Sequence, residues 1–291
     1  MKSLTLSSPA KVNLFLKIIR RLPNGYHELL TLFHRISLRD TLRLTATQKD
    51  IQIRCNQPAL SLGADNLITR AYRLLQKEFP KLGGVSVRLT KKIPMGGGLG
   101  GGSSNAGTFL LGMKKLYRLP LSNQKLTRLA AQLGADCAFF AQGVNQAIGE
   151  GVGEKLRPLP SKKKHWFVLI LGEQGLSTKQ VYQALPKKLP GVSLTKQKRV
   201  VKILAHFLEH QDYPSTVRLL RNDLEAPAFC LRPSIQKTIQ EIQSLGVPLV
   251  LMSGSGSTVF VMVDSQRAAQ ILKKKLQRVL RKRQIVVCHT Y

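Results

Sequence analysis

Acidic residues, cysteines and long apolar stretches are all scarce in this chain. Its 291 residues hold 15 Asp and Glu against 46 Lys and Arg, which gives a formal net charge of +31. The cysteines have neither paired nor metal-type spacing, which argues against a disulfide scaffold and fits reduced thiols in a cytoplasmic protein; they are Cys55, Cys137, Cys230 and Cys288. No apolar run approaches about 18 residues, so no transmembrane helix is predicted. We also expect no removable leader, because a candidate active-site segment already begins at Pro9.

The excess of positive charge predicts attraction to polyanions. The basic residues are nevertheless spread through the chain, without interleaved aromatics or a recognisable nucleic-acid-binding module. We therefore expect mostly solvated basic faces, no specific nucleic-acid partner, no membrane partner, and a monomer or weak dimer. The positive electrostatic potential would also attract a substrate that carries several phosphates.

The length favours two domains, because single cores usually split beyond roughly 250 residues. The segment 157–165 contains proline and many charges and precedes an apolar strand at 166–171. We place the boundary there, which gives domains 1–160 and 161–291. In the second half, the patterns predict helices near 200–210, 234–245 and 266–283 and strands at 248–252, 258–263 and 284–288. This order is typical of a split βαβ layout with extra helices.

A run of glycines stands out in the first half. It comprises Gly96, Gly97, Gly98, Gly100, Gly101 and Gly102, followed by Ser103, Ser104 and Asn105. Alternation over 85–89 predicts a strand before the run, and helical spacing from Ala106 to Met113 predicts a helix after it. Loop amides and the positive end of the helix dipole would converge on a phosphate.

Other interpretations of this loop are weaker. Gly96, Gly98 and Gly101 fit a dinucleotide-binding pattern, but no acidic residue follows about 20 positions later. A Walker A loop is excluded because Gly102 is followed by Ser103 rather than lysine. A flexible linker would be polar on both sides, whereas this loop lies between a strand and a helix.

Two charged residues complete the set that phosphoryl transfer to a hydroxyl requires. Lys11 and Asn13 lie on the polar face of a predicted strand over 12–18, and Asp136 follows a helix that ends near Gly134. Lys11 is the candidate cation, Asp136 the candidate base, and the glycine loop the phosphate cradle. Taken singly, Lys11 could be an exposed strand lysine and Asp136 a helix cap.

Two further patterns give local predictions. Asp65 is expected to cap a helix that carries Leu67, Ile68 and Ala71, and Ser122 is expected to cap the helix with Leu126 and Leu129. The segment 206–210 fits an H-x-x-E-H zinc-protease pattern, but no further ligand motif supports it. The remaining histidines, His34, His165 and His289, are interpreted as packing or surface residues.

Three segments, 8–14, 94–106 and 253–257, resemble the three motifs of the GHMP kinases. Five more resemble one branch of that family, which phosphorylates a cytidylylated alcohol in the non-mevalonate isoprenoid pathway: 25–27, 65–67, 133–136, 149–153 and 222–225. The match runs in order from Pro9 to about Val263. It implies an α+β, two-domain fold with a ribosomal S5 domain-2-like amino half and a ferredoxin-like carboxyl half.

The resemblance also implies roles for individual residues. Lys11 and Asp136 would be the catalytic pair at the 2-hydroxyl of the substrate. ATP would lie along Pro94, Met95, Gly96, Gly97, Gly98, Leu99, Gly100, Gly101, Gly102, Ser103 and Ser104, with Asn66 in the adenine pocket and Mg²⁺ at Ser103 or Ser104 and the phosphates. The alcohol would be bound by Asn13, Tyr26, His27, Tyr182, Ser253, Gly254 and Ser255, with both tyrosines stacking on cytosine.

The chain departs from the family pattern at three places. Asn24 stands where the family often has aspartate, Cys137 and Ala138 replace a common Val-Pro after Asp136, and Tyr182 occupies a position often held by phenylalanine. A kinase for another alcohol, such as homoserine or mevalonate, is the alternative within the family, and a basic nucleic-acid-binding protein is a more distant one. The aromatic residues separate the two kinases, because an alcohol without a base gives them nothing to stack on.

Overall fold

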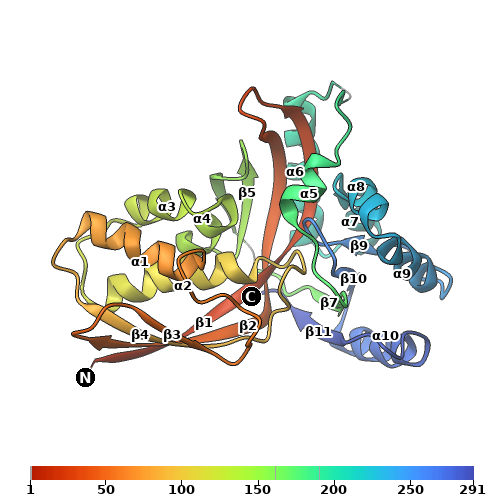
Figure 1. The fold of residues 1–291 in the computed structure, drawn as a ribbon. Coiled ribbons are helices and arrows are strands. Elements are labelled where there is room, and N and C mark those ends of the chain that lie inside the picture. Colours follow the sequence, from red (N-terminus) through yellow and green to blue (C-terminus); the bar gives the residue numbers. More distant parts are fainter. Residues whose placement is uncertain (1, 161, 190) are drawn as a thin grey trace. The chain divides into compact units, whose positions relative to one another are not determined.

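The computed structural model describes residues 2–160, 162–189 and 191–291, which divide into two compact units. Unit 1 comprises Met1–Ala10, Leu38–Ile93 and Gly100–Val144, and unit 2 comprises Lys11–Ser37, Pro94–Leu99 and Asn145–Tyr291. Two long strands, β1 (Ser3–Arg21) and β2 (His27–Thr47), contribute residues to both units (Figure 1). No helix in the described ranges is long and apolar enough to cross a membrane.

Unit 1 is a sheet covered on one face by helices. The sheet order is β3 (Gln52–Cys55), β4 (Gly84–Thr90), β2 and β1. The covering helices are α1 (Leu67–Glu78), α2 (Gly101–Leu116), α3 (Asn123–Ala131) and α4 (Ala135–Gln142) (Figure 1). Val85, Val87 and Leu89 of β4 form one core with Phe109 and Met113 of α2, which confirms the predicted strand and helix on either side of the glycine run.

The helix caps in unit 1 correct one prediction. Ser122 caps α3 as expected, because its Oγ accepts a hydrogen bond from Lys125 N at 3.1 Å. The cap of α1 is Asn66 and not Asp65: Asn66 Oδ1 accepts from Ile68 N at 2.9 Å, while Asp65 accepts from the Ser61 hydroxyl. Asp and Asn cap about equally well, so the sequence alone could not decide which of two adjacent residues would take the position.

Unit 2 contains two groups of strands. One has the order β6 (Lys155–Leu159), β5 (Gln146–Glu150), β2, β1 and β8 (Arg221–Asn222). The other is a four-stranded antiparallel sheet of order β11 (Ile285–His289), β7 (Trp166–Ile170), β10 (Val259–Val263) and β9 (Leu251–Met252). In chain order this is strand four, one, three, two, the ferredoxin-like arrangement that was predicted.

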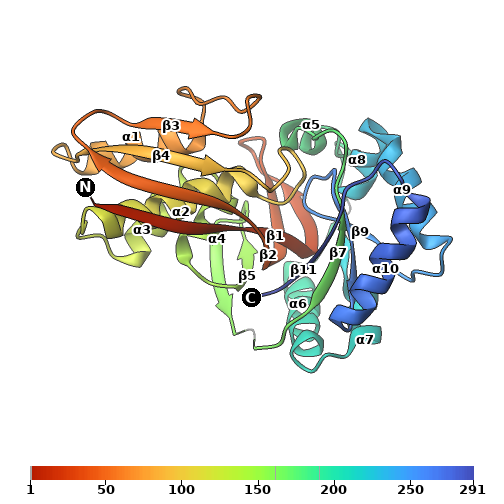
Figure 2. The ribbon, with the colours of Figure 1, turned by 90° about the horizontal axis from the view of Figure 1, so that it is seen from below.

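Six helices of unit 2 are described: α5 (Thr178–Gln183), α6 (Leu194–Glu209), α7 (Tyr213–Leu219), α8 (Glu225–Leu231), α9 (Pro233–Gln243) and α10 (Gln266–Val279). Ile235 and Ile239 of α9 and Leu276 of α10 share a core with Val168 and Val261 of the four-stranded sheet. Figure 2 shows α9 and α10 beside this sheet. The three shortest helices, α5, α7 and α8, were not predicted.

Residues 157–159 are a strand and not the predicted connection. They lie in β6, which pairs with β5 through Ile148 opposite Arg157 and Ala147 opposite Pro158. Proline suggested a loop, but an edge strand tolerates a residue without an N–H on its unpaired side. Ser161 lies outside the described residues, and the division into domains 1–160 and 161–291 stays a prediction.

A buried histidine pair in unit 2 predicts acid sensitivity. His34 and His165 are both buried, with ring centroids 6.0 Å apart. Burial lowers the pKa of His34 to about 3 and that of His165 to about 4. Both rings therefore stay neutral in the folded protein, whereas in the unfolded chain they gain protons near pH 6.5. Because the unfolded state binds more protons, stability falls as the pH drops from about 6.5 toward 4.

Calorimetric unfolding between pH 7.5 and 4.5 checks this expectation. The Tm should decrease steadily below pH 6.5, and the variant His34→Gln/His165→Gln should show a flatter decrease from a lower starting value. His206→Gln is the control, because His206 is exposed. A double variant as acid-sensitive as the wild type would contradict the assignment.

Candidate active site

The first half of the glycine loop belongs to unit 2, where its carbonyl groups accept hydrogen bonds from other segments. Gly96 O accepts from Leu176 N at 3.1 Å, and Gly97 O accepts from Thr258 N at 3.2 Å. Gly98 O accepts from both Lys11 Nζ at 2.9 Å and the Ser253 hydroxyl at 3.0 Å. Residues 95 and 96 form a turn that engages the Gly97 amide, whereas no described residue accepts a hydrogen bond from the amides of Gly96 and Gly98. These two donors are therefore available to an anion.

No residue other than glycine fits at position 98. Its φ is +73°, and a Cβ placed on it would lie 2.0 Å from Ser253 O and 2.9 Å from Gly256 N. Any side chain would separate the glycine loop from the 253–257 loop.

The second half of the loop begins helix α2 in unit 1, as the sequence predicted. Gly100 is the N-cap, with φ +69°, and no side chain caps the helix. A Cβ on Gly101 would lie 2.9 Å from Ile93 Cγ2 and 3.1 Å from Lys91 Nζ, so the first turn fits closely over these residues. The uncapped first turn of a 16-residue helix offers N–H donors and the positive dipole end to a phosphate.

A buried polar network supports this first turn. Lys91 Nζ lies 2.5 Å from Asp40 Oδ2, and both side chains are almost fully buried. Asp40 Oδ1 also accepts from Ile93 N at 2.8 Å. Asn105 of α2 joins the pair, because its Nδ2 donates to Asp40 Oδ2 at 2.9 Å and its Oδ1 accepts from Lys91 Nζ at 3.1 Å. The network ties the end of β4 to the first turns of α2.

Sequence reasoning missed Asp40 and Lys91. No local signal marked them, because Asp40 stands between Arg39 and Thr41 and Lys91 stands between Thr90 and Lys92. The same network turns one predicted ligand inward: Ser104 is fully buried, and its hydroxyl lies 2.8 Å from Ser8 Oγ. Ser103, the neighbouring residue, is partly exposed.

Asp136 lies in the first turn of α4, beside the start of α2. Gly107 of α2 lets the two helices approach, since a Cβ there would lie 2.7 Å from Phe140 Cβ. The Ser103 hydroxyl hydrogen-bonds the Cys137 side chain, and burial raises the pKa of that thiol to about 12, with the Asp136 charge adding to the effect. The first turns of α2 and α4, the latter with Asp136, thus meet through Ser103 and Cys137 within unit 1.

Lys11 lies at the glycine loop within unit 2. Its side chain is buried, and Nζ donates to Asn13 Oδ1 at 2.6 Å as well as to Gly98 O. Asn13 is fixed in turn, because its Nδ2 donates to Thr31 Oγ1 at 2.8 Å. The predicted proximity of Lys11 and Asn13 is therefore a direct hydrogen bond, and a cation stands beside the loop.

The 253–257 loop packs directly against this lysine. A Cβ on Gly254 would lie 2.9 Å from Lys11 Nζ and 2.9 Å from Gly98 O. Asn222 holds the loop, because its Nδ2 donates to Met252 O at 2.8 Å and to Gly254 O at 2.7 Å. Ser255 Oγ lies 2.9 Å from Thr178 Oγ1, which connects the loop to α5. Asn222 lies in the 222–225 segment of the family resemblance, but no role was predicted for it.

Two of the three predicted aromatic groups meet in unit 2. The His27 and Tyr182 rings are 5.5 Å apart and inclined by 36°. Burial and the nearby Arg21 lower the pKa of His27, so its ring is neutral near pH 7. Tyr26 lies in the adjoining turn and is 64% exposed, which leaves its ring accessible to a planar ligand.

Two sequence-derived candidates have local roles. The Asn66 side chain caps α1 and donates to Ser61 O at 2.6 Å, while the adjacent Leu67 lies beside Gly102. His206 and His210 stack with centroids 4.1 Å apart. Across the described ranges, no group of three His, Cys, Asp or Glu residues could hold a metal ion.

Two family models match the chain: the GHMP kinases N terminal domain at residues 66–147 and the GHMP kinases C terminal domain at residues 204–282. A relative from Acaryochloris marina, named 4-diphosphocytidyl-2-C-methyl-D-erythritol kinase, is 35% identical over 96% of this chain and 93% of its own. A relative of the same name from Marinobacter nauticus is 37% identical over 92% of this chain and 88% of its own.

Solved structures agree with these sequence matches. A crystal structure titled 4-(cytidine 5'-diphospho)-2C-methyl-D-erythritol kinase superposes with a TM-score of 0.79 at 33% identity and covers 99% of both chains. Homoserine kinase from Cytophaga hutchinsonii superposes with a TM-score of 0.78 at 19% identity, covering 100% of this chain and 95% of its own, and shares the fold.

Proposed function

The chain belongs to the 4-diphosphocytidyl-2-C-methyl-D-erythritol kinase family of the GHMP kinases, and on this premise we propose that it phosphorylates the 2-hydroxyl of that alcohol with ATP. The observation that carries the proposal is the glycine loop. Its carbonyls are hydrogen-bonded within unit 2, while the amides of Gly96 and Gly98 have no acceptor among the described residues.

The glycine loop fits a nucleotide triphosphate. In unit 2 the amides of Gly96 and Gly98 are available, and in unit 1 the uncapped first turn of α2 offers N–H donors. Neighbouring atoms leave no room for a side chain at Gly98 or Gly101. Residues 94–104 are assigned to ATP on this basis. We propose that Asn66 lies at the adenine, because the next residue, Leu67, lies beside Gly102 of the glycine loop. The Asn66 side chain itself caps α1.

Mg²⁺ is proposed as the metal of the reaction, where it would neutralise the phosphate charge. Of the two predicted serines, Ser103 is the better ligand, because its side chain is partly exposed whereas that of Ser104 is buried against Ser8. A hard cation of this kind keeps several water and phosphate ligands, so a single protein hydroxyl suffices.

The catalytic roles follow from the chemistry of the two charged residues. Asp136 would accept the proton of the 2-hydroxyl as phosphoryl transfer proceeds. Lys11, buried at the glycine loop, would stabilise the negative charge that develops on the transferring group. Asn13 would bind the sugar-like end of the alcohol and already fixes the Lys11 ammonium.

The cytosine site is assigned to the three aromatic groups. Tyr26 presents an exposed ring, and Tyr182 packs beside His27. A neutral His27 can donate or accept a hydrogen bond at a base edge. Ser253, Gly254 and Ser255 would line the alcohol side, because their loop packs against Lys11.

We also propose a cytoplasmic location, a monomer or weak dimer, and a domain division at residue 160. The four cysteines are free, which supports a cytoplasmic location. A monomer or weak dimer and the division at residue 160 are proposed on sequence grounds alone.

The acceptor is tested by comparing turnover of three alcohols. With ATP and Mg²⁺, ADP release should be fast with 4-diphosphocytidyl-2-C-methyl-D-erythritol and at least about 10³-fold slower, as kcat/KM, with homoserine or mevalonate. The expected ratio corresponds to about 4 kcal/mol of lost transition-state binding. Comparable rates with homoserine or mevalonate would favour the alternative kinase, and no ADP release with any of them would overturn the proposal.

The variant Tyr182→Leu tests the base site in the same assay. Loss of one stacking partner should raise KM for the cytidylylated alcohol about 10-fold, since stacking is worth about 1–3 kcal/mol, and leave KM for ATP unchanged. Tyr213→Leu is the matched control, because Tyr213 lies on α7 near His165. Equal effects of the two variants would contradict the stacking role.

A further inference from the structure

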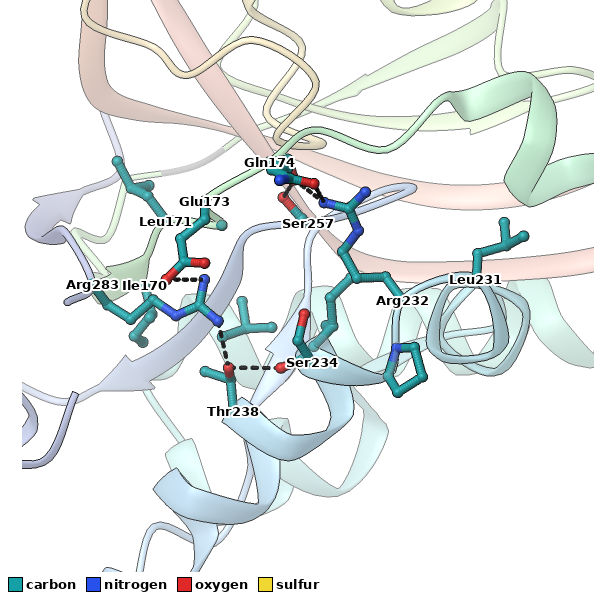
Figure 3. A pocket seen from close by; sticks show the side chains of 14 residues that line it. Ile170, Leu171, Glu173, Gln174, Leu231, Arg232, Ser234, Thr238, Ser257 and Arg283 are labelled. Atoms are coloured by element: carbon teal, nitrogen blue, oxygen red, sulfur yellow. Dashed lines mark hydrogen bonds and ion pairs between the residues drawn. The ribbon is translucent and has the colours of Figure 1, made fainter.

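A cavity of about 390 Å³ lies in unit 2. Its walls come from the segment after β7, the start of α9, the first residues of β10, and Arg283 after α10 (Figure 3). The volume falls in the range of small-molecule sites. None of the residues proposed for ATP, Mg²⁺ or the alcohol lines it.

Two arginines make the cavity cationic. Figure 3 shows Arg283 and Arg232 approaching from opposite sides, with Ser234 and Thr238 of α9 between them. Arg283 is held weakly, at 3.5 Å from Glu173 and 3.5 Å from Thr238 Oγ1. Arg232 donates through Nη1 to Gln174 O at 3.2 Å and to Gln174 Oε1 at 3.0 Å, and no other acceptor for its guanidinium is found in the described part of the chain. Guanidinium groups with remaining donors are suited to phosphate or carboxylate oxygens.

The remaining walls are of two kinds. Ile170, Ile235 and Val259 provide an apolar floor that belongs to the core of the four-stranded sheet. Ser234 and Thr238 add hydroxyl groups near the arginines. Such a combination suits a molecule with an anionic head and a short aliphatic body. Glu173 is the one acidic group in the wall and is 60% exposed, so an anion can displace it from Arg283.

We propose that this cavity is a second binding site, for a small molecule with a phosphate or diphosphate group on a short aliphatic body, and that its occupancy alters ATP binding. The first part is independent of the proposed function, whereas the second rests on it.

The coupling to ATP follows from the segment that forms one wall. Gln174 O accepts from the Ser257 hydroxyl at 2.7 Å and faces Arg232. The next residue, Gly175, packs on the glycine loop, because a Cβ there would lie 2.8 Å from Gly96 Cα. Leu176 N donates to Gly96 O. A ligand that moves Arg232 and Gln174 would therefore shift the backbone that holds Gly96.

Calorimetric titration of the full chain tests the site. The probes are inorganic pyrophosphate and pentyl diphosphate, with saturating ADP and Mg²⁺ present to occupy the nucleotide site. Pentyl diphosphate should bind more tightly than pyrophosphate. Arg232→Gln and Arg283→Gln should each weaken its binding about 10-fold or more, as expected for loss of a charge-assisted contact. Lys237→Gln, an exposed charge on α9 outside the cavity, should change it less than about twofold.

A filled cavity provides the second test. Ser234→Phe keeps the net charge but occupies the space between the arginines, and it should abolish pentyl diphosphate binding while leaving the Tm near that of the wild type. Binding to this variant, no binding to the wild type, or equal weakening by Lys237→Gln would overturn the site. If pentyl diphosphate binds the wild type but leaves KM for ATP unchanged, the coupling is refuted, whereas absence of any kinase activity refutes only the proposed function.

Discussion

Replacing Asp136 by asparagine is expected to lower kcat roughly 10²- to 10⁴-fold, because a side-chain amide cannot take the proton of the attacking hydroxyl. Asparagine has nearly the same shape and still suits the first turn of α4, so the fold and both KM values should change little. Coupled detection of ADP release with varied ATP and varied alcohol gives all three constants.

The control for Asp136→Asn is Asp50→Asn. Asp50 forms an exposed ion pair with Arg73 in the same unit, and such pairs contribute little. Its kcat should stay within about twofold of the wild type. If Asp136→Asn retained near-normal turnover, the general base would have to be sought elsewhere, and a kcat loss shared by both variants would indicate a general effect of charge.

Replacing Lys91 by methionine is expected to reduce the free energy of unfolding by about 3–5 kcal/mol, the usual cost of leaving one member of a buried ion pair alone. Asp40 would keep its hydrogen bonds from Asn105 and from the backbone of residues 92 and 93 but lose the Lys91 ammonium. Urea unfolding followed by circular dichroism measures the change.

Two variants sharpen this test. Lys92→Met removes an exposed neighbouring lysine and should change stability by less than about 0.5 kcal/mol. The double variant Asp40→Asn/Lys91→Met should recover part of the loss, because it removes the isolated charge as well. Equal stability of Lys91→Met and the wild type would show that the pair does not hold the start of α2.

Local patterns in the sequence were sufficient for much of the fold. Alternation over 85–89 and helical spacing from Ala106 placed β4 and α2 on either side of the glycines, as observed. The order of strands and helices after residue 166 predicted a split βαβ layout, which the four-stranded sheet has. These features are encoded by spacing along the chain, since each depends on which face of a single element is apolar.

Local patterns failed where neighbouring residues or a sheet edge decided the outcome. Asp65 and Asn66 are both good N-cap residues, and in the structure Asn66 occupies the N-cap position of α1. Pro158 indicated a connection, but pairing with β5 made it part of an edge strand. In both cases the competing structures differ by little in local energy, so contacts elsewhere in the unit decide between them.

By itself the sequence determined the position of the glycine run between a strand and a helix, and it supplied the hypothesis that Lys11 and Asp136 form the catalytic pair. Only the tertiary structure showed that Asp40 and Lys91 support the start of α2, that Asn222 holds the 253–257 loop against Lys11, and that two arginines face one cavity. Each of these joins residues far apart along the chain, and no periodicity within a single element encodes such a contact, because it depends on how several elements pack together.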